Sequence, residues 1–173
     1  MRSQKSALAI RRLFAAACML LAGFASSAPA AGPDSLFAAT LLDRDGKSVA
    51  LERYRGKPLI VNFWARWCGP CRVEIPELAK VHEKYKARGL VVLGIGLEEQ
   101  VDSARDFAKA YEMNYPSVLG DNRKTLWLMQ ALGNTRGGLP YTVIIDRHGK
   151  LVSSKLGVMS AADLEAAAQA LLN

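Results

Sequence analysis

The sequence is poor in cysteine and histidine, the side chains from which disulfide frameworks and most structural metal sites are built. It contains three cysteines and two histidines among 173 residues, far fewer cysteines than a small disulfide scaffold carries. Cys18 lies in an apolar N-terminal segment, which leaves Cys68, Cys71, His82 and His148 downstream. These four residues formally make a Cys₂His₂ set, but neither histidine has the spacing of a zinc knuckle. We therefore expect no metal site.

The chain also lacks internal repeats, low-complexity tracts and any stripe of basic residues. Its formal charge is +7, but residues 1–30 carry four of the positive charges and none of the negative ones. Residues 31–173 hold 19 Lys and Arg against 16 Asp and Glu, a formal charge of +3. Since these basic residues are scattered along the sequence, we expect no nucleic-acid partner.

Residues 1–30 have the composition of a secretory signal peptide. Basic residues come first, an apolar run follows over residues 13–25, and Ala28-Pro29-Ala30 fits a small-x-small cleavage signal. The apolar run is short for a membrane span, which needs about 20 residues. We therefore predict export to the periplasm; retention of the segment as an uncleaved inner-membrane anchor is the alternative.

Residues 31–173 are long enough to form one domain with a substantial core. Strands are predicted over 58–63, 90–96, 116–119, 141–146 and 151–155, with a hairpin over 37–51 that turns at Asp43-Arg44-Asp45-Gly46. Helices are predicted over 68–88, 101–113 and 123–132, the last capped by Asn122, and from Ser160, where Asp163 completes an approximate capping box. Such alternation implies a mixed sheet covered on both faces.

Residues 64–76 read Trp-Ala-Arg-Trp-Cys-Gly-Pro-Cys-Arg-Val-Glu-Ile-Pro and place a Cys-x-x-Cys pair between a strand and a helix. The free backbone N–H groups and the dipole at a helix N-terminus favour a thiolate, so we expect a lowered pKa for Cys68. Cys71, one turn further along, is placed to close a disulfide with it. A loop this small restricts the unfolded chain little, which favours a redox pair over a structural bridge.

Residues around the pair argue against two other kinds of site. A peroxiredoxin-like site has Thr or Ser three positions before the attacking cysteine, where this chain has Ala65. Covalent c-type haem attachment needs His directly after the second cysteine, where Arg72 stands. Arg66 and Arg72 either raise the local positive potential or are simply solvated, and the sequence leaves both readings open.

Several short motifs follow one another over most of residues 31–173. They are Asp43-Arg44-Asp45-Gly46-Lys47, Gly56-Lys57, Val61-Asn62-Phe63-Trp64, Trp67-Cys68-Gly69-Pro70-Cys71, Glu74-Ile75-Pro76, Gly138-Leu139-Pro140, and Ile144-Ile145-Asp146 with Gly149. In this order they resemble the thioredoxin superfamily, and within it the exported TlpA/ResA-like thiol–disulfide oxidoreductases. The resemblance implies an α/β thioredoxin-like fold, with a central mixed β-sheet flanked by helices and an N-terminal hairpin. It also implies an inserted strand–helix unit, for which residues 97–120 are the candidate.

The resemblance further implies how a client protein is held. Pro140 matches the family's cis-proline, which lies beside the disulfide and frees the backbone of Leu139 to pair with a substrate peptide. Trp67, Gly69 and Pro70 complete the expected client contacts around the cysteines. An ordinary trans turn proline is the alternative for Pro140, since cis X-Pro bonds are uncommon.

Glu74 is the third expected catalytic residue, beside Cys68 and Cys71. In the TlpA/ResA-like branch a glutamate at this position lies under the active site and serves as proton acceptor. Thioredoxins themselves carry a buried aspartate in the preceding strand, where this chain has Asn62, which cannot titrate. Burial of Glu74 would raise its pKa toward neutrality; the alternative is a solvated helix glutamate.

Together these features predict an exported enzyme that reduces disulfides of client proteins, with no cofactor. The resemblance implies re-reduction by a membrane electron donor resembling DsbD/CcdA, clients such as apocytochrome c or copper-site proteins, and a monomer. Two alternatives stay open. The same fold could donate its disulfide to clients, although the Gly-Pro dipeptide resembles reducing thioredoxins, or the chain could be a metal-binding, copper-delivery module.

Overall fold

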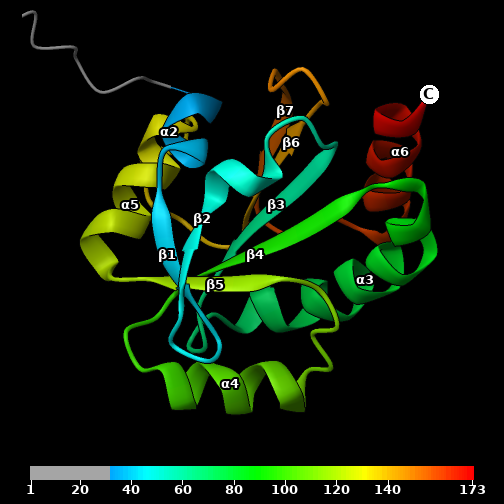
Figure 1. The fold of residues 1–173 in the computed structure, drawn as a ribbon. Coiled ribbons are helices and arrows are strands. Elements are labelled where there is room, and N and C mark those ends of the chain that lie inside the picture. The colour runs from blue at the N-terminus through cyan, green and yellow to red at the C-terminus, as the bar shows by residue number, and fades with distance from the viewer. Residues whose placement is uncertain (1–31) are drawn as a thin grey trace, which may run out of the picture.

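The computed structural model describes residues 32–173, so the leader predicted over residues 1–30 lies outside the described residues. Seven strands form one mixed sheet in the order β2-β1-β5-β4-β3-β6-β7, with helices on both faces (Figure 1). The strands are β1 (Thr40–Asp43), β2 (Ser48–Ala50), β3 (Leu59–Trp64), β4 (Val91–Leu97), β5 (Ser117–Gly120), β6 (Tyr141–Ile145) and β7 (Leu151–Leu156). The helices are α2 (Pro33–Phe37), α3 (Gly69–Tyr85), α4 (Val101–Ala110), α5 (Asn122–Ala131) and α6 (Ala161–Leu172), with 3₁₀ turns η1 (Leu51–Tyr54) and η2 (Lys86–Arg88).

Strand β3 lies in the interior of the sheet, next to the middle strand β4, and every one of its residues is buried. It pairs in parallel with β4 and antiparallel with β6. Because side chains alternate along a strand, Ile60 and Trp64 enter one hydrophobic cluster while Val61 and Phe63 enter the other. Asn62, the polar residue of this strand, is therefore buried on the same face as Ile60 and Trp64.

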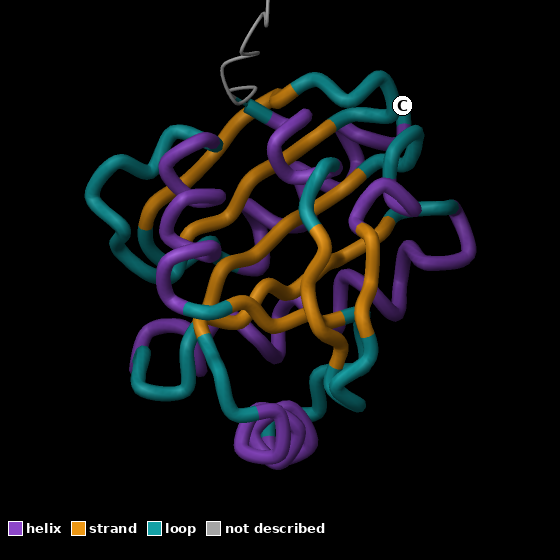
Figure 2. The backbone as a smooth tube through the Cα atoms, turned by 60° about the vertical axis from the view of Figure 1, so that its left-hand side comes forward, coloured by secondary structure: helices purple, strands orange, loops and turns teal. Residues whose placement is uncertain are grey.

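The two faces of the sheet have different helical covers. One cluster collects apolar side chains from α3, α4 and α6, and the other collects them from α2, η1 and α5. Figure 1 shows α3 and α6 together on one side of the sheet and α2 and α5 on the other, and Figure 2 shows α4 nearly end-on at the bottom of the molecule. This arrangement is the thioredoxin-like fold with an N-terminal hairpin that the sequence predicted.

The helix predicted over 68–88 is confirmed as α3 followed by η2. Its backbone continues through Pro76, and the apolar face resumes beyond it at Leu78 and Val81, both buried. The segment ends at Gly89, whose φ of 89° lies in the left-handed region that glycine adopts at helix ends. β3, before this helix, and β4, after it, pair in parallel. The N-terminus of α3 therefore lies at the carboxyl end of this strand pair.

Residues 97–120 contain the inserted unit. The helix predicted over 101–113 is present as α4 and the strand predicted over 116–119 is present as β5. β5 lies between β4, to which it is parallel, and β1, to which it is antiparallel. A parallel neighbour needs a crossover connection, which α4 supplies.

Four local features differ from the predictions: two short elements were missed and two helix ends were misplaced. The short helix α2 was not predicted, and it occupies the start of the segment expected as a hairpin, so that β1 begins only at Thr40. η1 was also missed. Helix α4 ends at Ala110 instead of residue 113, since Glu112 has a left-handed φ of 51° that a helix does not allow. Asp121, not Asn122, caps α5, because its side chain accepts the Lys124 backbone N–H at 2.7 Å.

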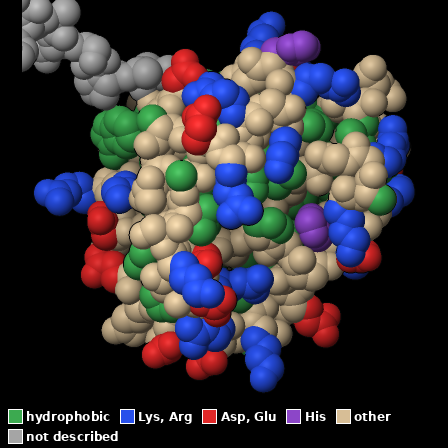
Figure 3. Space-filling view, viewed as in Figure 1, with side chains coloured by type: hydrophobic (Ala, Val, Ile, Leu, Met, Phe, Trp, Pro, Cys, Tyr) green, Lys and Arg blue, Asp and Glu red, His purple; other side chains and the backbone are tan. Residues whose placement is uncertain are grey.

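Charged side chains of both signs intersperse over the face of the molecule drawn in Figure 3. Within residues 32–173, none of the helices combines the length and the apolar character that crossing a bilayer requires.

We expect Asp121→Ala to lower the free energy of unfolding by about 0.5–2 kcal/mol, the usual effect of removing an N-cap. Asn122→Ala is the matched control. It should change the free energy of unfolding by only a few tenths of a kcal/mol, because Asn122 is the first residue inside the helix and not its cap. Urea unfolding midpoints of the two variants measure the difference. Equal destabilisation by both substitutions would contradict the assignment of Asp121 as the cap.

Candidate active site

Cys68 and Cys71 form a disulfide at the start of α3, a few residues beyond the end of β3. Cys68 is the N-cap residue, and its Sγ accepts the backbone N–H of Cys71 at 3.2 Å. Cys68 is 4% exposed, whereas Cys71 is fully buried. A sulfur arriving from solvent therefore reaches Cys68 first. In the reduced state the Cys71 N–H and the positive end of the helix would stabilise a thiolate at Cys68.

The surface around the disulfide carries apolar groups that face solvent. Trp67 is 69% exposed, and Gly69 and Pro70 are exposed beside it. The Leu139–Pro140 bond is cis, as expected from the motif. Leu139 is half-buried and packs against both hydrophobic clusters, one of which contains the two cysteines.

Trp64 differs from its neighbour Trp67 because it is fully buried. Its ring stacks on Phe107 of α4, with ring centroids 5.0 Å apart and planes 9° apart. Gly96 of β4 makes room for it, since a Cβ at that position would lie 2.9 Å from a Trp64 ring carbon. The inserted helix thus packs directly on the strand that leads into the cysteine pair.

A buried acid holds the segment before Cys68 in place. Glu98 is 7% exposed, and its carboxylate accepts the Arg66 backbone N–H and the Arg66 Nε–H, each at 2.9 Å. Arg72 donates to the Arg66 carbonyl at 2.7 Å. Arg66 is therefore ion-paired, which answers the question the sequence left open for it. Sequence reasoning missed Glu98; the available signal was an acid directly after a buried strand, at the strand end that meets the motif.

Glu74 is fully buried on the inner face of α3 and is not the solvated residue of the alternative interpretation. Its carboxylate accepts three hydrogen bonds: from Asn62 Nδ2 at 2.6 Å, from the Met159 backbone N–H at 2.8 Å, and from the Thr142 hydroxyl at 3.4 Å. Burial raises the pKa of Glu74 above its ordinary value, and these hydrogen bonds, together with the charge of Lys155, oppose the rise.

Thr142 and Met159 were not anticipated from the sequence. Thr142 is buried in β6, where it lies opposite Asn62 in the antiparallel pair with β3. Met159 lies in the loop between β7 and α6. The usable signal was a threonine two residues after the cis-proline in an otherwise apolar strand. Met159 donates through its backbone N–H, and no pattern of side chains in the sequence reveals such a donor.

Neither histidine contacts a cysteine through the interactions described for it. His82 meets the Tyr115 ring edge-on at 6.3 Å, and His148 lies in the turn between β6 and β7, where its N–H donates to Asp146. Within residues 32–173 there is no group of three or more His, Cys, Asp or Glu side chains that could hold a metal ion.

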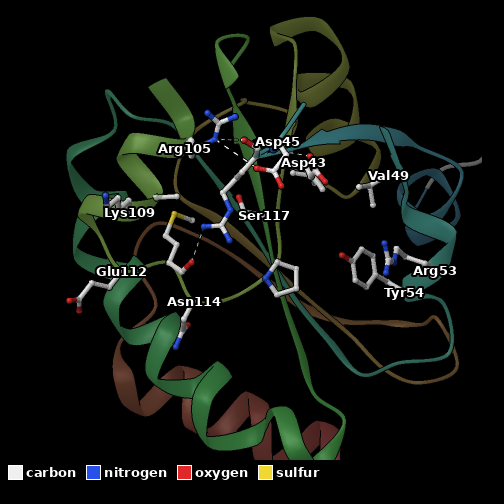
Figure 4. Close-up of a pocket in the computed structure, with 15 residues that line it drawn as sticks. Asp43, Asp45, Val49, Arg53, Tyr54, Arg105, Lys109, Glu112, Asn114 and Ser117 are labelled. Atoms are coloured by element: carbon white, nitrogen blue, oxygen red, sulfur yellow. Dashed lines mark hydrogen bonds and ion pairs between the residues drawn. The ribbon is translucent and has the colours of Figure 1, made fainter. Parts of the chain in front are cut away.

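An open crevice of about 770 Å³ lies between the β1–β2 hairpin, η1 and the α4–β5 unit (Figure 4). Arg44 donates across it to the Met113 carbonyl at 3.0 Å, and Arg105 donates to the Arg44 carbonyl at 2.9 Å. Neither cysteine lines it. Its polar contacts join the hairpin to the inserted unit.

A thioredoxin-like sheet, a disulfide at the N-terminus of the helix after β3, and a cis-proline preceded by a residue that packs against the cysteine cluster together define the class of thiol–disulfide oxidoreductases. Within that class the chain belongs to the AhpC/TSA family, whose model matches residues 33–154.

Known proteins agree with this assignment. The thiol-disulfide oxidoreductase ResA of Geobacillus kaustophilus is 31% identical over 125 residues, which cover 72% of this chain and 69% of that protein. A thioredoxin-family thiol:disulfide interchange protein from Chlorobium tepidum has a TM-score of 0.68 at 29% identity, covering 86% of this chain and 100% of that one. A secreted thiol-disulfide isomerase from Corynebacterium glutamicum has a TM-score of 0.69 at 26% identity, covering 78% and 83%.

Proposed function

We propose that the protein reduces disulfide bonds of client proteins through a Cys68/Cys71 dithiol–disulfide cycle. One observation carries this proposal above the others: the more accessible cysteine is the N-cap of α3, and the inner cysteine is buried on the same helix as a buried carboxyl. This arrangement separates an attacking sulfur from a resolving sulfur, which is what two successive thiol–disulfide exchanges require.

In the first exchange the Cys68 thiolate attacks one sulfur of the client disulfide. The client S–S bond breaks, a mixed disulfide forms, and the other client sulfur leaves as a thiolate. Cys71 then loses its proton and attacks Cys68 Sγ, which re-forms the Cys68–Cys71 disulfide and releases the second client sulfur. Two electrons pass from the pair to the client.

Glu74 is the proposed acceptor of the Cys71 proton. It follows Cys71 by three residues on α3, so the two side chains lie on one face of the helix. Its raised pKa brings proton uptake closer to neutral pH than that of an exposed glutamate. Asn62, in the adjacent strand, is an amide and cannot take up the proton in its place.

The proposed client surface consists of Trp67, Gly69 and Pro70 next to the cysteines in the chain, together with Leu139 and Pro140. The exposure of Trp67 supports it, because a large aromatic side chain in solvent is the kind of group that anchors a partner. The backbone of Leu139, ahead of the cis bond, would pair with an extended client segment.

We place this activity in the periplasm, with residues 1–30 as the export signal or an uncleaved anchor and residues 31–173 as the catalytic domain. The secreted relative from Corynebacterium glutamicum supports export. An exported reductant needs a supply of electrons, for which a membrane donor resembling DsbD/CcdA is proposed. Maturation of cytochrome c or of metalloproteins is the proposed setting.

The same site could instead donate its disulfide to clients. The reduction potential of the Cys68–Cys71 pair, measured by equilibration with a thiol buffer, separates the two directions. We expect about −230 mV or lower, the range of reducing members of this fold. A value near about −120 mV would assign the protein to the oxidants. Metal analysis of the reduced protein tests the copper-delivery alternative, for which we expect no bound metal.

Cys71→Ser should trap the mixed disulfide, because the resolving sulfur is gone. We expect the reduced variant to form a covalent adduct with a peptide that carries an intramolecular Cys-x-x-Cys disulfide, detected by mass spectrometry under non-reducing conditions. Cys68→Ser is the control and should form little adduct, since Cys71 is fully buried. The absence of adduct with Cys71→Ser would count against client reduction.

Glu74→Gln should slow oxidation of the dithiol by up to about 10²-fold, the lower end of general-base contributions. In the wild type the base is lost as pH falls through the Glu74 pKa, which is raised, so this limb should lie above pH 4.5. The variant should lack the limb. Glu77→Gln is the control, because it removes the same charge from the same helix outside the buried network. An unchanged profile in Glu74→Gln would remove Glu74 from the mechanism.

A further inference from the structure

The side-chain amide of Asn62 is satisfied at one end only. Its Nδ2 donates to Glu74 Oε2 at 2.6 Å and to Thr142 Oγ1 at 2.9 Å. Its Oδ1 is equally buried and has no hydrogen-bond partner among the described residues. Leaving a buried acceptor unpaired is unfavourable, so its presence beside a titratable carboxyl calls for a physical reason.

The two oxygens of Glu74 have different surroundings. Oε1 accepts from the Met159 N–H and lies 3.4 Å from the Thr142 hydroxyl, whereas Oε2 accepts from Asn62. Every one of these contacts presents a hydrogen to the carboxyl group, which suits the ionised form because a carboxylate only accepts. A proton taken up by Glu74 would go to Oε2, because this oxygen accepts one hydrogen bond whereas Oε1 accepts two. It would then meet the Asn62 NH₂ group, so two donors would face each other.

We propose that Asn62 is a positioning residue whose side-chain amide turns by half a rotation when Glu74 takes up a proton. Oδ1 then replaces Nδ2 opposite Oε2 and accepts the hydrogen bond from the protonated carboxyl. The inference rests on the proposed role of Glu74 as proton acceptor and adds the group that lets this buried carboxyl hold a partner in both protonation states.

The rotation lowers the number of hydrogen bonds in the network from four to three, but the carboxyl and the Thr142 hydroxyl keep a partner in each arrangement. With Glu74 ionised, the Thr142 hydroxyl accepts from Asn62 Nδ2 and points its own hydrogen toward Glu74 Oε1. After the rotation the Thr142 hydroxyl donates to Asn62 Oδ1 instead, while the Met159 N–H keeps its bond to Oε1. The end of the amide without a partner changes from Oδ1 to Nδ2. Since the amide oxygen and nitrogen are of similar size, the packing of β3 against α3 stays the same.

The exchange suits a carboxyl that must gain and lose a proton. A fixed donor opposite Glu74 would favour the ionised form, and a fixed acceptor would favour the protonated form. The charged or titratable groups that face Glu74 from other elements are Lys155 on β7 and the buried Tyr115 ahead of β5. Lys155 is ion-paired with Asp163 at 2.8 Å. On α3 itself the group is the Cys71 thiol of the reduced protein.

Side-chain NMR of the oxidised wild-type protein tests the rotation directly. With ¹³C and ¹⁵N labelling, we expect the Glu74 Cδ and Asn62 Nδ2 resonances to titrate with one midpoint. Cross-peaks between the Asn62 amide protons and the Thr142 side chain should be present above that midpoint and lost below it. Cross-peaks that persist through the whole titration would show a fixed amide and overturn the inference.

Glu74→Gln supplies the control, because residue 74 can then no longer titrate. The Asn62 Nδ2 resonance should become independent of pH over the same range, and a titration that persists in the variant would also overturn the inference. The measurement uses no client and no turnover. A fixed amide would therefore overturn the rotation without affecting the results of client trapping or of the reduction-potential measurement. Conversely, if the reductase proposal failed, the NMR spectra would still decide whether the amide rotates.

Discussion

The burial of one carboxyl, Glu74, is the constraint on which the rest of the site depends. A carboxyl removed from water needs hydrogen-bond donors, and three separate parts of the fold supply them: Asn62 from β3, Thr142 from β6 and the Met159 N–H from the loop before α6. These parts come together only when β3 and β6 pair in register and α6 packs beside α3. The central sheet and the last helix therefore fix the chemical environment beneath the disulfide.

The same helix links that carboxyl to the surface. Because α3 begins at Gly69, Cys68 lies at its positive end while Cys71 and Glu74 lie on its buried side. The entry to α3 is held by the contacts of Arg66 with Glu98 and by the Trp64–Phe107 stack. The insertion contributes one partner to the stack, so α4 supports the reactive loop in addition to connecting β4 with β5.

Local patterns in the sequence identified most of the elements and the centre of the site. The Cys-x-x-Cys pair, the helix it opens and the buried strand before it are all signalled by residues close together in the chain. Partners brought in by the fold were not. Glu98, Thr142 and the Met159 N–H lie 32, 80 and 85 residues from the groups they bind, and strand pairing places them there. The cap at Asp121 was missed because Asp and Asn are both favoured N-cap residues and stand next to each other in the sequence.

Two buried acids, Glu98 and Glu74, lie in the segments around the cysteine pair, and they differ in the charge of their hydrogen-bond donors. Glu98 has a fixed cationic partner in Arg66 and also accepts the Arg66 backbone N–H, which suits it to holding the loop. Glu74 has neutral donors only in direct contact, and the nearest cation that acts on it, Lys155, is itself paired with Asp163. Without a cation in contact, desolvation raises the pKa of Glu74 and makes proton uptake accessible. The acid paired with arginine therefore acts as structure, and the acid surrounded by neutral groups is the one that we propose as the proton acceptor for Cys71.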